Sequence, residues 1–229
     1  MRLLLLSSST VHGYGFLDHS EPDIRRLLEG RDSVAFVPFA QHDHEGYGAR
    51  VRERLATMGF DTTVVQGPGE IESAQAIFIG GGNTFRLLKT LYEREMLDGI
   101  RARVHADIPY LGSSAGTNVA TPTIRTTNDM PIVYPPSFDA LALFPWQINP
   151  HYLDADPNST HKGETREERL REYLDANDTP VIGLREGSAL WVDGSSLTLL
   201  GTQTARVFRK HAEPEEMTWN ASPLASAIR

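Results

Sequence analysis

The first half of the sequence alternates short strand-like runs with amphipathic stretches, and this alternation limits the fold more than any other feature. The strand-like runs lie at residues 3–6, 34–39, 62–65, 76–79 and 108–111. Apolar side chains recur at helical spacing at residues 24–28, 47–58 and 85–104, the last of which we interpret as one long helix. Apolar strands that alternate with helices form a parallel sheet covered on both faces. We therefore predict an α/β fold with a mostly parallel, doubly wound sheet flanked by helices.

The pattern changes after Pro122. Residues 123–160 are rich in Pro, Asn, Asp and Thr, which predicts loops with short strands. A helix is expected to begin at Thr165, because Thr165 and Glu168 have the spacing of a capping box. Further strand-like runs predict an antiparallel C-terminal extension of the sheet, at residues 181–184, 189–192, 197–200 and 205–208. With no linker or repeat in the sequence, we expect a single domain over residues 1–229.

The composition excludes several classes of protein and site. A net charge of -8 opposes nucleic-acid binding, which requires a basic surface. The sequence has no cysteine, which excludes disulfides, thiolate metal sites and a Cys nucleophile. No apolar run reaches the ~20 residues of a membrane span, and the run at residues 3–6 is too short for a signal peptide. We expect a cytoplasmic protein with no nucleic-acid or membrane partner, and the sequence leaves its oligomeric state open, with a homo-oligomer as one alternative.

The run at residues 108–111 leads into Gly112-x-Ser114-x-Gly116 and then into small residues. This is the pattern of a nucleophile elbow, a sharp turn between a strand and a helix that exposes a serine hydroxyl. The spacing selects Ser114, and the N-terminus of the following helix would offer N–H groups to a developing negative charge. An ordinary turn that contains a serine has the same pattern, so the interpretation depends on other residues.

A second glycine-rich turn, Gly80–Asn83, also follows a strand-like run. In an open parallel sheet the carboxyl ends of the strands share one edge, where ligands bind. A serine hydrolase needs two N–H donors for its oxyanion, and we predict Ala115, directly after Ser114, and Gly82. A phosphate-binding loop is the alternative, but the triple glycine fits neither the dinucleotide nor the Walker pattern.

The serine needs a base, and the sequence has eight histidines. His151 follows the strand-like run 146–150, so its position predicts a place at the same edge of the sheet. His161 lies in a polar segment typical of a solvated loop. His42 and His44 flank one residue in a polar loop, and we do not interpret them as a metal site.

The base needs a carboxylate to orient it, and the sequence leaves two candidates. Glu186 ends the run that begins at residue 181, and Asp129 lies in a polar loop. The order Ser114, His151, Glu186 differs from the Ser, acid, His order of α/β-hydrolases and points away from that fold. We expect no metal and no cofactor.

Five blocks of the sequence resemble the peptidase E family, at residues 80–85, 114–116, 122–132, 147–151 and 161–167. Members of that family are aspartyl dipeptidases, serine peptidases on a fold like that of class I glutamine amidotransferases. The resemblance extends from the first strand to about Gly187 and then fades. Two positions depart from the family pattern, which has Trp at the position of Ser113 and Pro at the position of Arg185.

The resemblance implies a serine peptidase that hydrolyses small dipeptides with an N-terminal aspartate through an acyl-enzyme. It implies the residues selected above as catalytic and oxyanion-binding groups, namely Ser114, His151, Glu186, Gly82 and Ala115. It also implies Arg166 and Asn83 as substrate-binding residues, with Arg166 pairing with the substrate carboxylate and Arg125 as the alternative.

Two other functions remain open from the sequence alone. One is a cyanophycinase-like hydrolase of β-aspartyl bonds on the same scaffold. The other is a non-catalytic, amidotransferase-like binding domain, which the joint presence of Ser, His and Glu disfavours.

Overall fold

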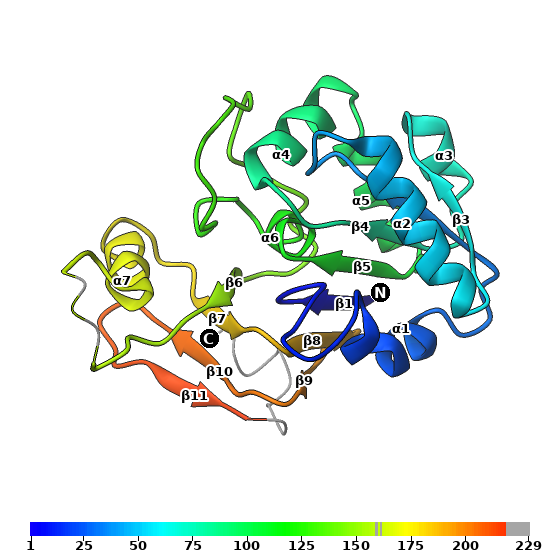
Figure 1. Ribbon diagram of the computed structural model, residues 1–229. Helices are drawn as coiled ribbons and strands as arrows, with labels where there is room; N and C mark the ends of the chain where they lie inside the picture. Colours follow the sequence, from blue (N-terminus) through cyan, green and yellow to red (C-terminus); the bar gives the residue numbers. More distant parts are fainter. Residues whose placement is uncertain (159, 161, 219–229) are drawn as a thin grey trace.

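The computed structural model describes residues 1–158, 160 and 162–218, which form two β-sheets with helices around them (Figure 1). The larger sheet has seven strands, in the spatial order β3 (Asp61–Val64), β2 (Ser33–Val37), β4 (Ile77–Ile79), β5 (Tyr110–Ser113), β1 (Arg2–Leu6), β8 (Ser188–Asp193) and β9 (Ser196–Gly201). Strands β3, β2, β4, β5 and β1 pair in parallel, and each coincides with a predicted strand. The predicted fold class is confirmed.

The C-terminal strands are divided between the two sheets. Strands β8 and β9 extend the larger sheet in antiparallel pairing, as predicted. The predicted strands near residues 181 and 205 instead join a second, four-stranded sheet, in the order β11 (Glu215–Met217), β10 (Ala205–Phe208), β7 (Val181–Arg185) and β6 (Gln147–Tyr152). Strands β6 and β7 pair in parallel, and the other pairs of this sheet are antiparallel.

Seven α-helices occur in the described residues: α1 (Glu21–Leu27), α2 (His44–Thr57), α3 (Pro68–Glu72), α4 (Thr84–Glu93), α5 (Leu97–His105), α6 (Ala115–Val119) and α7 (Arg166–Ala176). A short 3₁₀ turn, η1 (Asp18–Ser20), precedes α1. Helix α7 begins at the predicted capping box. The Thr165 hydroxyl accepts from the backbone N–H of Glu168, and the Glu168 carboxylate accepts from the N–H of Thr165.

The prediction of one long helix over residues 85–104 is wrong, because the chain forms α4 and α5 there. Glu95 adopts φ 54°, a left-handed conformation that ends α4, and the N–H of Met96 bonds back to the carbonyl of Leu91. The apolar residues Leu91 and Leu97 on either side of the break are both buried. The apolar spacing therefore continues through the break and gives no sign of it.

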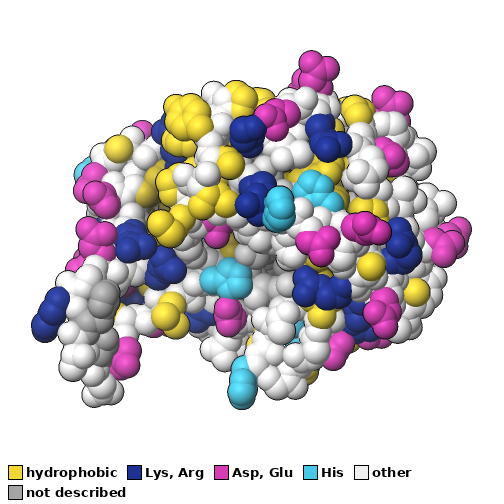
Figure 2. Space-filling model, turned by 45° about the horizontal axis from the view of Figure 1, so that its top comes forward, with side chains coloured by type: hydrophobic (Ala, Val, Ile, Leu, Met, Phe, Trp, Pro, Cys, Tyr) yellow, Lys and Arg dark blue, Asp and Glu magenta, His cyan; other side chains and the backbone are white. Residues whose placement is uncertain are grey.

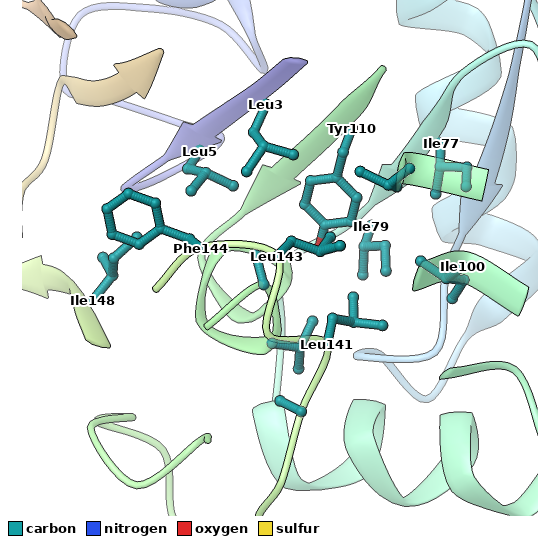
Figure 3. Packing of buried hydrophobic residues seen from close by; sticks show 14 of the residues in the cluster. Leu3, Leu5, Ile77, Ile79, Ile100, Tyr110, Leu141, Leu143, Phe144 and Ile148 are labelled. Atoms are coloured by element: carbon teal, nitrogen blue, oxygen red, sulfur yellow. The ribbon is translucent and has the colours of Figure 1, made fainter. Parts of the chain in front are cut away.

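Apolar side chains alternate along β1 and enter two separate cores. Leu3 and Leu5 pack with Ile79, Ile100 and Tyr110 and with apolar residues of the segment 140–148 (Figure 3). Leu4 and Leu6 pack on the opposite face against apolar residues of α1 and α2. A third, smaller cluster joins α7 to the second sheet, formed by Tyr152, Leu170, Leu174, Val181 and Phe208. The central sheet is thus covered on both faces, and no described helix is long and apolar enough to cross a membrane.

Candidate active site

The elbow between β5 and α6 holds Ser114 in an unusual backbone conformation, at φ 53° and ψ -107°. A Cβ on Gly112 would lie 2.7 Å from the carbonyl oxygen of Gly116, and one on Gly116 would lie 2.0 Å from the carbonyl oxygen of Ile79. Both flanking glycines are thus required by close backbone approach. A non-glycine residue keeps such a conformation only where its surroundings fix it, at a cost of ~1–3 kcal/mol.

The structure brings Ser114, His151 and Glu186 into one hydrogen-bonded chain. His151 Nε2 lies 3.0 Å from Ser114 Oγ, and His151 Nδ1 lies 2.6 Å from Glu186 Oε1. A neutral imidazole protonated at Nδ1 donates to the carboxylate and leaves Nε2 to accept the serine proton. The His151 and Glu186 side chains are 41% and 56% exposed, so a substrate can reach them.

Figure 2 shows a hollow in one face of the molecule, with histidine, basic and acidic side chains around it. A pocket beside Ser114 is lined by Ala115, Asp129, Pro150 and His151, among others. The prediction that His151 follows a strand at the same edge of the parallel sheet is wrong. His151 lies within β6 and Glu186 follows β7, both strands of the second sheet, so the three side chains come together from two sheets.

Asp129, the other candidate for the acid, lies in the same pocket but is bound elsewhere. Its Oδ2 accepts hydrogen bonds from the backbone N–H and the hydroxyl of Thr84, both at 2.6 Å. Thr84 is the first residue of α4, where a carboxylate is favoured by the unpaired N–H groups of the helix. Glu186, and not Asp129, is within hydrogen-bond distance of His151.

The two predicted oxyanion donors differ from their neighbours in their hydrogen bonding. The N–H of Gly80 donates to the Val37 carbonyl, and that of Gly81 donates to the Tyr47 hydroxyl at 2.9 Å. The backbone N–H groups of Gly82 and Ala115 have no partner in the part of the chain that the structure describes. Both therefore remain available to bind an anion.

Close packing keeps the triple-glycine loop against the elbow. A Cβ on Gly81 would lie 3.1 Å from the Ser114 Cβ, and one on Gly82, at φ 141°, would lie 2.4 Å from the Ala40 carbonyl oxygen. The Tyr47 ring occupies the space where a Gly80 side chain would lie. Burial raises the pKa of Tyr47 to about 12, so its hydroxyl stays neutral. Tyr47 is a site residue that the sequence suggested only as part of a helix.

Arg166, the predicted partner of a substrate carboxylate, is half-buried at the first position of α7. It lines a pocket with Arg125, Asn128, Asn149 and Tyr173. Burial lowers the pKa of its guanidinium, which remains charged at neutral pH. Among the described residues, the Arg166 side chain has neither a hydrogen-bond nor an ion-pair partner.

The Arg166 pocket adjoins the pocket of the serine, because Thr127 and Asn128 line both. Arg125, on the same wall, is exposed, and Arg169 is exposed and lies 3.5 Å from a Glu164 carboxylate oxygen. A cation without a partner among the described residues thus lies in a pocket that adjoins the one beside Ser114.

Residues 3–200 match the model of peptidase family S51. The chain belongs to peptidase family S51. It is 53% identical over 221 residues to "Peptidase E" of Streptomyces coelicolor, covering 95% of this chain and 91% of that protein. It is 50% identical over 230 residues to a "Probable alpha-aspartyl dipeptidase" of Drosophila melanogaster, covering 97% and 94%. The protein is therefore a peptidase, a hydrolase of peptide bonds.

Solved structures support the same fold. A putative peptidase E from Listeria monocytogenes superposes with a TM-score of 0.66 at 24% identity, covering 88% of this chain and 98% of that one. A peptidase from an acI-B1 actinobacterium superposes with a TM-score of 0.71 at 18% identity, covering 96% and 95%. At these low identities the structural likeness shows the fold of this S51 chain and nothing further.

Asn83, predicted to bind substrate, makes hydrogen bonds within this S51 peptidase. Its Oδ1 accepts from the N–H of Arg86, which caps α4, and its Nδ2 donates to the carbonyl of Met130. These contacts use both ends of the amide to hold the loop after β4. Asn83 therefore stays a prediction as a substrate ligand, with a structural role evident in its contacts.

The two departures from the family pattern lie in different surroundings. Ser113 is fully buried, and its hydroxyl has no partner among the described residues, so its side chain lies inside the protein and not in the pocket beside Ser114. Arg185 forms ion pairs with Asp154 and Glu216 at 2.7 and 2.9 Å. His161 lies outside the described residues.

Proposed function

We propose that this S51 peptidase hydrolyses dipeptides with an N-terminal aspartate, through an acyl-enzyme formed on Ser114. The observation that carries the proposal is that two pockets adjoin, with Thr127 and Asn128 in the lining of both. One holds the Ser114–His151–Glu186 chain of hydrogen bonds, and the other holds the unpaired Arg166. The name of the Drosophila relative, at 50% identity, supports the same substrate class.

In the proposed first step, His151 Nε2 takes the proton of Ser114 Oγ as that oxygen attacks the carbonyl carbon of the aspartyl residue. Glu186 accepts a hydrogen bond from Nδ1–H and stabilises the imidazolium that forms. The carbonyl oxygen becomes an oxyanion, which the N–H groups of Gly82 and Ala115 bind. Because these groups have no other partner in the described residues, binding the oxyanion breaks no existing hydrogen bond.

The tetrahedral intermediate then collapses. The C–N bond breaks, and the imidazolium of His151 gives its proton to the leaving amine, which departs as the second amino acid. The product left on the enzyme is an aspartyl ester of Ser114. A water molecule attacks the carbonyl carbon of this ester while His151 takes a proton from the water. His151 then gives that proton to Ser114 Oγ as the ester bond breaks and free aspartate leaves.

The proposed selectivity rests on Arg166. The side chain of an N-terminal aspartate carries a carboxylate, and burying that charge without a partner is costly. A guanidinium pairs with a carboxylate through two parallel hydrogen bonds, a geometry that lysine cannot reproduce. Because Arg166 has no competing partner among the described residues, its donors are available to the substrate. The local cation explains how a chain of net charge -8 would attract an acidic substrate.

The proposal treats residues 1–229 as one peptidase domain that acts in the cytoplasm on a small dipeptide. The test is a panel of dipeptides with a shared second residue: Asp-Leu, Glu-Leu, Asn-Leu, and Leu joined through the β-carboxyl of Asp. We expect the highest kcat/KM for α-linked Asp-Leu. A preference for the β-linked isomer would make the protein a β-aspartyl hydrolase instead, and equal rates on Asp-Leu and Asn-Leu would remove the role of the carboxylate.

A further inference from the structure

Ser7, directly after β1, is fully buried beneath the catalytic pair and belongs to none of the groups that act on the substrate. Its hydroxyl accepts a hydrogen bond from the backbone N–H of His151 at 2.9 Å and donates one to the carbonyl of Leu184 at 2.7 Å. Leu184 lies two residues before Glu186. One hydroxyl therefore ties together the two chain segments that carry the base and the acid.

These two bonds occur where the pairing of β6 with β7 is interrupted. Pro150 pairs with Leu184, and Tyr152 pairs with Arg185, so His151 is an extra residue, a β-bulge in β6. A bulge leaves some backbone N–H and C=O groups of the two strands without their regular partners. Burying such a group without a hydrogen bond costs folding free energy. The Ser7 hydroxyl supplies a partner to one group on each strand.

The bulge also places His151 at φ 53°, a left-handed conformation that is uncommon for a non-glycine residue. Such a conformation persists only where the surroundings fix it. The imidazole depends on it, because Nε2 must stay near Ser114 while Nδ1 stays near Glu186. Of the described groups, the Ser7 hydroxyl is the one that holds the His151 backbone N–H.

The residue before Ser7 contacts the third catalytic segment. The Leu6 carbonyl accepts from the N–H of Ser114 at 3.1 Å and from the Thr117 hydroxyl at 2.6 Å. The end of β1 is therefore in contact with the segments that carry all three proposed catalytic side chains.

We propose that Ser7 is a positioning residue, whose hydroxyl sets the His151 imidazole relative to Ser114 and Glu186; this rests on the catalytic roles given under the proposed function. The neighbouring Ser8 offers a matched comparison. Ser8 is also buried, but its hydroxyl has no hydrogen-bond partner among the residues described. A Ser→Ala change at either position removes one buried oxygen, and only at Ser7 does it remove the two bonds.

The experiment compares Ser7→Ala with Ser8→Ala in the full chain. Steady-state kinetics on Asp-Leu give kcat and KM, and low-field proton NMR follows the proton between His151 Nδ1 and Glu186. We expect Ser7→Ala to lower kcat by roughly 10- to 100-fold, the scale of a small misplacement of a catalytic group. We expect KM to change by less than about 3-fold, since substrate binding is not altered, and the low-field resonance to be lost or displaced. Ser8→Ala should keep both kcat and the resonance.

A Ser7→Ala variant with normal kcat and an unchanged resonance would overturn the proposal. So would equal kinetic losses in the two variants, because they would indicate a general effect of buried serines. If Ser7→Ala does not fold, Ser7→Cys replaces it, since a thiol has a similar shape but donates and accepts weakly. That variant should also lose kcat, and normal kcat together with a normal resonance would refute the role. The resonance does not require turnover, so an inactive wild-type enzyme would refute the proposed function while the Ser7 comparison remained interpretable.

Discussion

Replacing Arg166 with alanine tests the proposed basis of selectivity. Arg166 is half-buried, has no hydrogen-bond or ion-pair partner in the described part of the chain, and lies in a pocket that adjoins the one beside Ser114. We expect Arg166→Ala to lower kcat/KM for Asp-Leu and to have a much smaller effect on a slow neutral substrate such as Ala-Leu.

The magnitude follows from the surroundings of the guanidinium. A hydrogen bond to a charged group contributes ~1.5–3 kcal/mol, and breaking a buried ion pair costs ~3–5 kcal/mol. Solvent reaches part of the Arg166 side chain, so the loss should lie below the upper end of that range. About 2–4 kcal/mol corresponds to a loss of about 30- to 1000-fold in kcat/KM. Arg166→Lys should recover only part of it, because lysine cannot form the paired bonds.

The assay is steady-state kcat/KM on Asp-Leu and Ala-Leu, with Arg169→Ala as the control. Arg169 lies three residues further on in the same helix and lines the same pocket, but it is exposed and 3.5 Å from Glu164, so its removal should change neither rate by more than a few-fold. Equal losses on both substrates in Arg166→Ala would refute the reasoning. They would show that Arg166 supports the fold or catalysis in general, and Arg125 would become the next candidate for selectivity.

Three further predictions follow from other contacts. Glu186→Ala should lower kcat on Asp-Leu more than Asp129→Ala does, because Glu186 bonds His151 while Asp129 bonds Thr84; a larger loss at Asp129 would transfer the role of the acid. Tyr47→Phe should lower kcat by roughly 10-fold with little change in KM, since the Gly81 N–H loses its partner beside the oxyanion loop, and an unchanged kcat would contradict that role. Arg185 lowers the pKa of Asp154 and of Glu216, so their contribution to stability is present at neutral pH and is lost as the pH falls below ~4. Thermal melts of wild type and Arg185→Ala should therefore differ at pH 7, and the difference should shrink as the pH falls below ~4; a difference that stays constant would argue against the ion pairs.

The larger sheet could be predicted from the sequence because four of its five parallel strands, β1, β2, β4 and β5, are buried on both sides. Runs such as residues 3–6 and 76–79 are then continuously apolar, and few other structures require that pattern. The partners of the later strands could not be predicted in the same way. The apolar run at residues 181–184 predicts a buried strand but not which strand lies beside it, and β7 pairs with β6 and β10 in a separate sheet. The break at Glu95 escaped prediction because it preserves the apolar spacing.

The residues of the candidate site also fall into those that the sequence could identify and those that it could not. Ser114 could be selected because it follows a strand of the parallel sheet, at the edge where the carboxyl ends of such strands meet. The same argument selects His151, although that residue lies within β6 of the second sheet, so the pattern identifies the residue but not its place in the fold. For the acid, the strand end and the resemblance favour Glu186 over Asp129 from the sequence, but neither shows which carboxylate contacts His151; in the structure that residue is Glu186. Ser7 and Tyr47 could not be found at all. Their contacts join residues far apart in the chain, such as Ser7 with His151, and a buried serine or tyrosine carries no local pattern that marks such a contact.

The central claim is that Ser114 is the nucleophile, and the most direct measurement is kcat/KM on Asp-Leu for Ser114→Ala beside Ser113→Ala. The two serines are adjacent, but Ser113 is fully buried without a hydrogen-bond partner for its hydroxyl among the described residues, while Ser114 bonds His151. We expect Ser114→Ala to lose at least about 10⁴-fold in kcat/KM, as expected for loss of a covalent nucleophile, with thermal unfolding unchanged. Ser113→Ala should stay within a few-fold of wild type. Near-normal turnover by Ser114→Ala, with or without a loss in Ser113→Ala, would contradict the account.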